Sequence, residues 1–377
     1  MRLYTFFLSL FGNYAAFFVL LAMLYYVYVV LRATIYAKKL PISAQSSLPF
    51  VSVIIAARNE AANIEKCLTS ILAQDYPKEH FEIWLIDDAS EDETYALVEK
   101  LAQKHTHLHL LAARKFSKKA AISEGVSRAK GEIILQTDAD CEVTSNWLSS
   151  IVPHFEANTA LISAPVFLGY PNFSFFEKLQ SLEFMGLNLL GGGSMNSGNA
   201  NMCNGANLAY RKKVFEEVGG FQGIDQVASG DDELLLQKIL ALKTYQVKYV
   251  YDEKAIVRTP AQTTFRDFWQ QRLRWVSKAR YYTNRWVNLT QLIFAIAITG
   301  VPFLAFFGQV QAAFFLFSLK CLADIFLMYK ATHFFREKPL FFYFFFPLQL
   351  AYYLYVPSIA VMGNFVNQYE WKGRKVK

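Results

Sequence analysis

The chain has 377 residues, of which 54% are hydrophobic and only 18% are charged; soluble globular proteins carry about 25% charged residues, so part of this chain is expected to lie in lipid. The net charge is +7, but no Lys/Arg-rich run with interleaved aromatic residues is present, so no nucleic-acid partner is expected. The four cysteines are widely spaced and form no CxxC pair, which argues against a zinc site and a disulfide framework.

Residues 3–31 form an uncharged apolar stretch that is long enough to cross a bilayer as a helix, which takes about 20 residues. The stretch runs into Arg32 without the small residues of a signal-peptide cleavage site. We therefore expect residues 1–32 to form an uncleaved transmembrane anchor. Because basic residues favour the cytoplasmic side, Arg32, Lys38 and Lys39 place its C-terminal end in the cytoplasm.

A short linker rich in Pro and Ser (40–49) leads into a segment, 48–260, in which apolar runs of strand length alternate with helical patterns. We expect strands at 50–57, 81–88, 132–138 and 160–167, and helices over 60–73, up to about 104, and over 119–129. Continuous apolar strands that alternate with helices predict an α/β domain with a mainly parallel sheet covered on both faces. Ligands of such sheets bind beyond the carboxyl ends of the strands.

Residues 261–286 mix Trp, Phe and Tyr with Arg and Lys, which is typical of an amphipathic helix in the membrane interface. Apolar stretches follow at 289–308, 312–329 and 339–366, and we expect two or three transmembrane helices within 287–366. Lys320 and Asp324 are four residues apart, on one helix face, and are expected to form a structural ion pair.

The basic tail, residues 367–377, bears on the number of membrane crossings. One crossing before the domain and three after it would leave the tail outside, against the positive-inside tendency. Since the last stretch contains Pro339, Pro347 and Pro357, we favour a re-entrant or broken hairpin that returns the tail to the cytoplasm. Other basic residues are interpreted as membrane-flanking charges: Arg272, Arg274, Lys278, Arg280 and Arg285.

Three acidic clusters punctuate the α/β segment. They are Asp87-Asp88 after the second strand, Asp138 and Asp140 after the third, and Asp231-Asp232-Glu233 after Gly230. Any one of them could cap a helix or lie in a solvated turn. Carboxylates that meet at one sheet edge, however, need a cation or hydrogen bonds to offset their burial. The three clusters together therefore predict a site for Mg²⁺ or Mn²⁺, which prefer oxygen ligands.

Five motifs lie in order between residues 50 and 285: SVIIAARNE (52–60), IDDASEDET (86–94), FSKKAAISEGVSRAKGEIILQTDAD (116–140), NGANLAYRK (204–212) with SGDDELL (229–235), and QQRLRW (270–275). With the flanking membrane segments they resemble glycosyltransferase family 2, which includes cellulose, chitin, hyaluronan and poly-N-acetylglucosamine synthases and ceramide glucosyltransferase. A DxD motif alone occurs by chance in many chains, whereas five motifs at the family's spacing are specific. The resemblance implies a GT-A fold, which is Rossmann-like with a mainly parallel mixed sheet, joined here to transmembrane helices.

The resemblance also implies which residues bind a nucleotide-sugar donor and a metal. The expected donor residues are Ala57, Arg58 and Glu60 after the first strand, Asp87 or Asp88 at the uracil or ribose, Lys119 with Lys118 as its rival, Asp138, and Arg274 at the diphosphate. Asp140, together with Asp138, would ligate Mg²⁺ or Mn²⁺ between the two phosphates.

Asp232 is the expected general base, with Asp231 as the alternative, because inverting transfer needs a carboxylate that deprotonates the acceptor hydroxyl. Trp275 would form a platform under the acceptor sugar. The other expected acceptor residues are Gln271, Asn204, Gly205, Ala206 and Asn207. Residues 189–201, rich in Gly and Asn, are expected to form a mobile loop near this site.

The expected activity is metal-assisted, inverting transfer of a sugar, from UDP with GDP as the alternative carrier, by a multi-pass enzyme of the cell membrane with a cytoplasmic catalytic domain. The acceptor is a lipid, a lipid-linked sugar or a polysaccharide, so processive synthesis and single transfer both stay open. The short membrane region slightly favours a lipid. A non-catalytic membrane scaffold is a distant alternative, because every expected catalytic carboxylate is present. The sequence does not identify the sugar, the oligomeric state or partner subunits.

Overall fold

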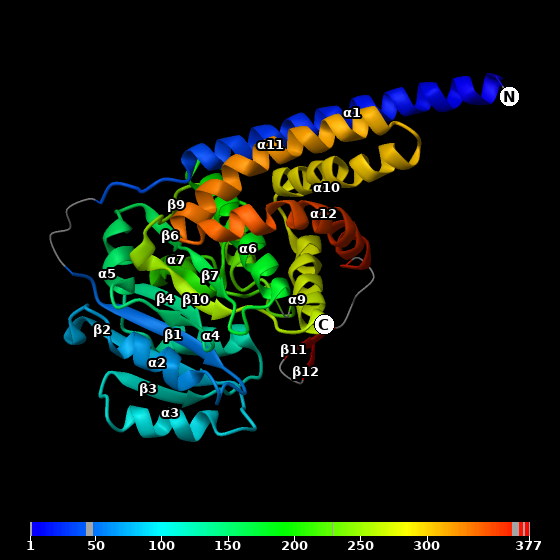
Figure 1. Cartoon of the computed structure of the whole chain (residues 1–377). Helices are drawn as coiled ribbons and strands as arrows, with labels where there is room; N and C mark the ends of the chain where they lie inside the picture. Colours follow the sequence, from blue (N-terminus) through cyan, green and yellow to red (C-terminus); the bar gives the residue numbers. More distant parts are fainter. Residues whose placement is uncertain (1, 43–47, 228, 364–368, 372–373, 377) are drawn as a thin grey trace.

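The computed structural model describes residues 2–42, 48–227, 229–363, 369–371 and 374–376. An α/β domain occupies one side of the molecule, and long apolar helices are gathered along the other (Figure 1). This division agrees with the change in sequence texture at the expected linker, of which residues 43–47 lie outside the described part of the chain.

A seven-stranded sheet, in the order β3-β2-β1-β4-β8-β6-β9, forms the centre of the α/β domain. Its strands are β1 (Val51–Ala57), β2 (Phe81–Asp87), β3 (Leu108–Ala112), β4 (Ile133–Asp138), β6 (Thr159–Ser163), β8 (Leu208–Arg211) and β9 (Gln246–Tyr249). β1 is parallel to both of its neighbours, whereas β8 is antiparallel to both β4 and β6. The strands β1, β2 and β4 are nearly continuous runs of buried residues because helices cover both faces. The predicted mainly parallel α/β sheet is thus confirmed.

The remaining elements of the domain surround this sheet. The helices are α2 (Ile64–Leu72), α3 (Thr94–Ala102), α4 (Lys118–Arg128), α5 (Trp147–Ile151), α7 (Lys212–Glu217) and α8 (Glu233–Ala241), with short 3-10 turns η1 (Lys78–His80), η2 (Val152–His154), η3 (Gly205–Asn207) and η4 (Glu253–Ala255). A second, three-stranded sheet holds β5 (Glu142–Val143), β10 (Val257–Pro260) and β7 (Val166–Gly169). The last of these strands in the chain, β10, is followed by the helix α9 (Phe265–Ser277).

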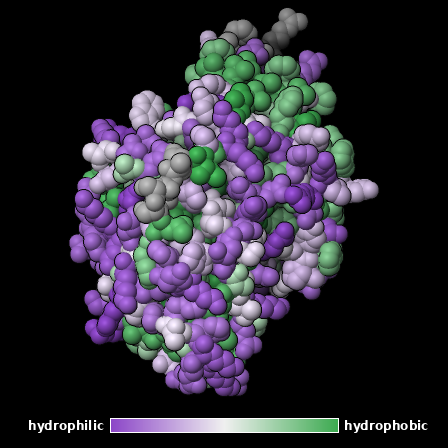
Figure 2. Space-filling view, turned by 90° about the vertical axis from the view of Figure 1, so that its left-hand side faces the viewer, coloured by the Kyte–Doolittle hydropathy of each residue, from purple (hydrophilic) through white to green (hydrophobic). Residues whose placement is uncertain are grey.

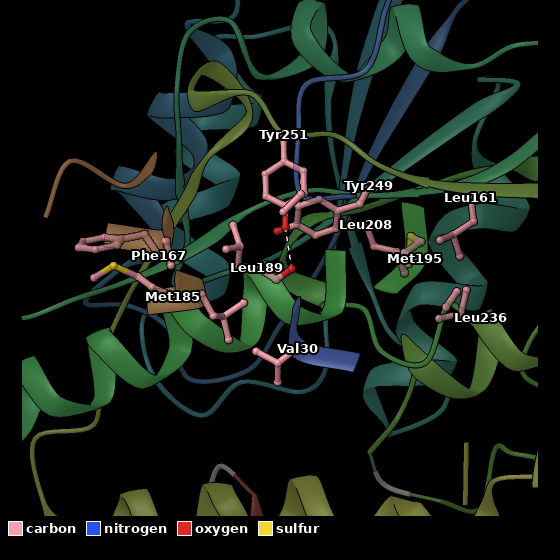
Figure 3. Packing of buried hydrophobic residues seen from close by; sticks show 14 of the residues in the cluster. Val30, Leu161, Phe167, Met185, Leu189, Met195, Leu208, Leu236, Tyr249 and Tyr251 are labelled. Atoms are coloured by element: carbon pink, nitrogen blue, oxygen red, sulfur yellow. Dashed lines mark hydrogen bonds between the residues drawn. The ribbon is translucent and has the colours of Figure 1, made fainter. Parts of the chain in front are cut away.

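The helix α6 (Phe175–Asn196) lies between the sheet and the apolar helices. Its residues Met185, Leu189 and Met195 gather with Val30 and Tyr249 in one buried cluster (Figure 3). The prediction of a mobile loop at 189–201 is therefore wrong for residues 189–196, which form the last two turns of α6. The glycines there allow close packing: a Cβ on Gly193 would lie 1.9 Å from the carbonyl oxygen of Ala33.

Four helices are long and apolar enough to cross a membrane among the residues that the structure describes. They are α1 (Arg2–Tyr36, apolar over Gly12–Tyr36), α10 (Arg285–Phe306), α11 (Val310–Phe334) and α12 (Lys338–Gly363). The end of the molecule that these helices form is dominated by apolar residues in Figure 2. The expected ion pair is confirmed, since Lys320 Nζ lies 2.6 Å from Asp324 Oδ2. Tyr26 and Gln349 each donate a hydrogen bond to the same carboxylate.

The helix α12 differs from the expected broken hairpin, because Pro347 and Pro357 lie inside one continuous helix. Both of its ends nevertheless lie against the α/β side of the molecule. Glu337, just before the helix, accepts a hydrogen bond of 2.7 Å from Tyr170. At the other end, a Cβ on Gly363 would lie 2.8 Å from Val276 of α9 (Phe265–Ser277). The tail at 367–377 is described only for the strands β11 (Tyr369–Trp371) and β12 (Arg374–Val376), and its side of the membrane stays a prediction.

Candidate functional site

A cavity of about 790 Å³ opens beyond the carboxyl ends of β1 and β4. Four of the five sequence motifs contribute side chains to its wall, although the first and the last are more than 200 residues apart in the chain. The predicted site residues that line it are Arg58, Glu60, Asp138, Asp140, Asn204, Gly205, Ala206, Asp231, Asp232, Gln271, Arg274 and Trp275. The tertiary fold thus brings most of the predicted donor, metal, base and acceptor residues into one cleft.

Arg58 is fixed at the rim of the cleft by the loop that follows β2. Its guanidinium donates to the carbonyl oxygens of Asp88 and Ala89, at 3.0 and 2.5 Å, and lies 2.8 Å from a carboxylate oxygen of Glu91. The loop of the second motif (86–94) therefore fixes Arg58 of the first motif (52–60). The Arg58 guanidinium lies where a donor would enter. Glu60 is held beside it through its backbone N–H, which donates to Thr94 at 2.8 Å.

Ala57, Asp87 and Asp88 do not belong to the wall of this cavity. All three are buried directly behind Arg58, at the ends of β1 and β2. Within the described part of the chain, Oδ1 of Asp87 is buried without a hydrogen-bond partner. The donor role of Asp87 stays a prediction.

The structure favours Lys118, rather than Lys119, as the lysine of the donor site. Lys118 lines the cleft, and its Nζ lies 2.7 Å from Asp138 and 3.2 Å from Asp231. Lys119 points the other way and donates to the carbonyl oxygens of Ile224, Val227 and Ser229. Burial lowers the pKa of Lys119 to about 8. The donor role expected for Lys119 is therefore corrected: it holds the loop that leads into Asp231 and Asp232.

We expect Lys119→Met to lower the free energy of unfolding by about 2–4 kcal/mol, because three buried carbonyl oxygens would lose their donor. Lys118→Met should instead weaken donor binding, since its ammonium faces the cleft. Chemical denaturation and nucleotide titration of both variants measure the two effects. A larger loss of stability in Lys118→Met than in Lys119→Met would contradict this division of roles.

The carboxylates of Asp138 and Asp140 are suited to a divalent metal. Among the described residues, their oxygens and the Cys141 sulfur form a group within 4.8 Å of one another. Burial, with Asp140 and Asp138 nearby, raises the pKa of the Cys141 thiol well above its usual value. The Cys141 thiol donates a hydrogen bond of 3.6 Å to Asp140 Oδ1, and the oxygen ligands that the two carboxylates offer suit Mg²⁺ or Mn²⁺.

Asp231 and Asp232 differ in their environments, although they are adjacent. Burial acts to raise the pKa of Asp231, but Lys118, Lys119 and a hydrogen bond from Gln136 outweigh it and hold this pKa below its usual value. Asp231 is thus a paired anion and a weak base. Asp232 caps α8: its Oδ1 accepts from Glu233 N–H at 2.7 Å, and its Oδ2 accepts from Gly205 N–H at 3.0 Å. Each oxygen keeps a lone pair, so Asp232 is oriented and can still accept a proton.

Lys278 is a site residue that the sequence reasoning missed. It lines the cleft, and its Nζ lies 3.6 Å from Asp232 and 3.1 Å from Glu233. Burial acts to lower the pKa of Lys278, but Asp232 and Glu233 raise it, so the ammonium stays charged beside the base. Its position four residues after Arg274, one turn along the same helical segment, was the signal that could have found it.

The helix α9 delivers Gln271, Arg274 and Trp275 to the cleft. Trp275 is held from two sides: the Phe184 ring centroid lies 5.7 Å from its own, and the Arg272 guanidinium lies 4.2 Å from its ring. Arg272 is buried and pairs with Glu183 of α6 at 2.7 Å. The interpretation of Arg272, Arg274 and Lys278 as membrane-flanking charges is therefore wrong, because their side chains point into the α/β domain.

Asn204 and Gly205 lie at the cleft, whereas Asn207 is part of the core beneath it. The Asn207 side chain accepts from Trp147 Nε1 at 2.9 Å and donates to the carbonyl oxygens of Pro165 and Ala255, both at 2.8 Å. Because its amide is fully used by these partners, the acceptor role expected for Asn207 is corrected to a structural one.

The α/β domain is similar in sequence to known glycosyltransferases. Residues 52–219 match the family model described as glycosyl transferase family 2. Glycosyltransferase AglE of Haloferax volcanii is 30% identical over 196 residues, which are 50% of this chain and 60% of AglE. The beta-monoglucosyldiacylglycerol synthase of Trichormus variabilis is 28% identical over 255 residues, 64% of this chain and 52% of the synthase. The chain thus spans only about half of the length of these relatives.

A solved structure has a similar fold over almost the whole chain. The mannosyltransferase PcManGT of Pyrobaculum calidifontis, in complex with GDP-Man and Mn²⁺, matches with a TM-score of 0.57. The match covers 93% of this chain and 99% of PcManGT at 20% identity. At this identity the likeness concerns the fold, and it confirms the expected GT-A class with attached apolar helices.

Proposed function

Since residues 52–219 match the family model of glycosyl transferase family 2, we propose that this chain transfers a sugar from a nucleotide-sugar to a lipid or lipid-linked hydroxyl, with inversion. One observation carries the proposal: Asp140, Asp232 and Arg274, from distant parts of the chain, line one cavity of about 790 Å³. A non-catalytic scaffold would not need an acid-base group, a metal site and a phosphate-binding cation in the same cleft.

Cations at the cleft suit the diphosphate of the donor. Arg58, Lys118 and Arg274 line the cavity, and guanidinium groups match phosphate oxygens in pairs. Asp138 and Asp140 would hold Mg²⁺ or Mn²⁺, which neutralises the charge of a leaving diphosphate. The bound GDP-Man and Mn²⁺ in PcManGT are consistent with such a donor site. UDP is the proposed carrier and GDP the alternative.

The transfer is a single-step displacement in which residues of this chain move the proton and position the reactants. Asp232 accepts the proton of the acceptor hydroxyl, and the hydroxyl oxygen bonds to the sugar carbon on the face opposite the diphosphate. The bond to the diphosphate breaks at the same time, and the nucleoside diphosphate leaves with the electron pair. Lys278, 3.6 Å from Asp232, orients that carboxylate, and Trp275 contacts the acceptor sugar with the part of its side chain that lines the cavity.

The proposed enzyme is a multi-pass protein of the cell membrane with its catalytic domain in the cytoplasm. Four helices long and apolar enough to span a bilayer support the membrane part. The name of the Trichormus relative, a glucosyldiacylglycerol synthase, is consistent with a lipid acceptor. A processive polysaccharide synthase is the second candidate, because the resemblance also includes polymer-forming enzymes.

A donor screen with the purified chain in lipid nanodiscs tests this function. UDP- and GDP-linked sugars labelled in the sugar are supplied with Mg²⁺ or Mn²⁺, and nucleoside diphosphate release is measured. We expect release with one carrier and label in the chloroform-soluble lipid. Label in high-molecular-weight material would instead favour the polysaccharide synthase, and binding of a donor without turnover would favour the scaffold.

A further inference from the structure

Three exposed phenylalanines lie on two segments that meet near the cleft, since the ring centroids of Phe176 and Phe265 are 6.2 Å apart. Phe173 is 69% exposed, Phe175 59% and Phe265 63%; we call them the mouth patch. Phe265 stands between Thr264 and Arg266, both of which line the cavity. Large apolar side chains that are this exposed near a site entrance indicate a surface that another molecule covers in the functional state.

The turn that presents Phe173 is built rigidly. Phe173 has a φ of +52°, a backbone conformation in which a bulky residue is an outlier. A capping box between Ser174 and Glu177 begins α6 immediately after it, and the Glu177 carboxylate also accepts from the backbone and side chain of Asn172. The surrounding hydrogen bonds therefore hold an unfavourable conformation that turns an apolar ring outward, which indicates a function for that ring.

The mouth patch continues into the apolar helices. The Phe175 ring centroid lies 5.1 Å from that of Phe344 in α12. The same helix exposes a stripe of apolar residues at four-residue spacing: Phe342, Phe346, Leu350 and Leu354. Since residues four apart lie on one helix face, these residues form an apolar face of α12 that is separate from the side on which Phe344 touches the mouth patch.

The charge beside the patch suits a lipid headgroup. Lys178 Nζ lies 5.8 Å from the Phe173 ring centroid and 6.0 Å from that of Tyr170. A lysine ammonium held beside aromatic rings at a membrane interface would meet the phosphates of lipid headgroups. The observations thus combine apolar exposure, a held backbone, a ring contact with α12 and an adjacent cation.

We propose that the mouth patch is immersed in the membrane interface and binds the acyl chains of the lipid acceptor, so that the acceptor hydroxyl enters the cleft from the bilayer. This proposal rests on the proposed function, because it takes the acceptor to be a lipid. It adds the route of the acceptor: the lipid stays in the bilayer and only its head reaches Asp232 and Trp275.

The double variant Phe173→Ser/Phe175→Ser in nanodiscs tests the route. Transfer to a long-chain lipid acceptor should fall about tenfold or more, since two apolar side chains no longer enter the hydrocarbon. Transfer to a short-chain, water-soluble form of the same acceptor, and the KM for the donor, should not change. The matched control is Phe306→Ser, which replaces another exposed phenylalanine, the last residue of α10. Equal losses with both acceptors, or with the control, would overturn the proposal.

A measurement without turnover separates this proposal from the proposed function. Phe173→Cys carrying a bimane label should be quenched by brominated lipids as strongly as labelled Phe306→Cys, while labelled Tyr95→Cys on α3 should not be quenched. The parent chain, with its own cysteines, gives the background. If no lipid product forms but Phe173 is quenched, the acceptor class is wrong while the membrane contact stands. If Phe173 behaves like Tyr95, the mouth patch does not meet the bilayer.

Discussion

Asp232→Asn is expected to reduce turnover by about 10²–10⁴-fold, because the amide cannot take the proton of the acceptor hydroxyl. The variant should still fold, since asparagine is a good residue at the N-terminal cap of α8, where Asp232 accepts from Glu233 N–H. Affinity for the nucleoside diphosphate should be nearly unchanged. Steady-state rates of transfer and calorimetric titration with the nucleotide measure the two quantities.

Asp225→Asn is the matched control for this prediction. Asp225 is exposed in the loop that precedes Asp231 and Asp232. The same type of substitution at Asp225 should therefore not change the rate of transfer. Near-normal turnover in Asp232→Asn would contradict its assignment as the base. A greater loss in Asp231→Asn than in Asp232→Asn would move the role to Asp231, against the pairing of Asp231 with Lys118.

Removal of divalent metal is expected to stop transfer, and Asp140→Asn should lower the rate by about 10²-fold or more. The reason is that the charge on the leaving diphosphate would no longer be neutralised by a cation that the carboxylates of Asp138 and Asp140 hold. The variant should also need at least about tenfold more Mg²⁺ or Mn²⁺ for half of its maximal rate. The measurement is the rate of transfer against metal concentration after treatment with a chelator.

Cys141→Ser distinguishes the ligands of this site. The Cys141 sulfur lies with the two carboxylates, but Mg²⁺ and Mn²⁺ prefer oxygen ligands to sulfur. We therefore expect the metal dependence of Cys141→Ser to equal that of the parent chain. A shift as large as that of Asp140→Asn would show a thiolate ligand, and full activity in the presence of chelator would exclude a metal requirement altogether.

The strands and acidic clusters were predictable because their signals are local. The strands β1, β2 and β4 carry continuous apolar runs, and the structure places them within one or two residues of the predicted bounds. The strand β3 (Leu108–Ala112) was missed. It lies at the edge of the sheet, is only partly buried and contains His109, so its apolar signal is weak. The glycines of 189–196 indicated a loop, although their function is close helix packing against Ala33 and Tyr249.

The amino-acid sequence by itself determined the α/β domain, the apolar helices, the order of the motifs and the residue types needed for donor, metal and base. The tertiary structure decided which of two neighbours faces the cleft: Lys118 rather than Lys119, and Asn204 rather than Asn207. It also decided that Arg272 and Lys278 point into the domain. Adjacent side chains on a helix point about 100° apart, and only the packing of distant segments fixes which of those directions is the cleft.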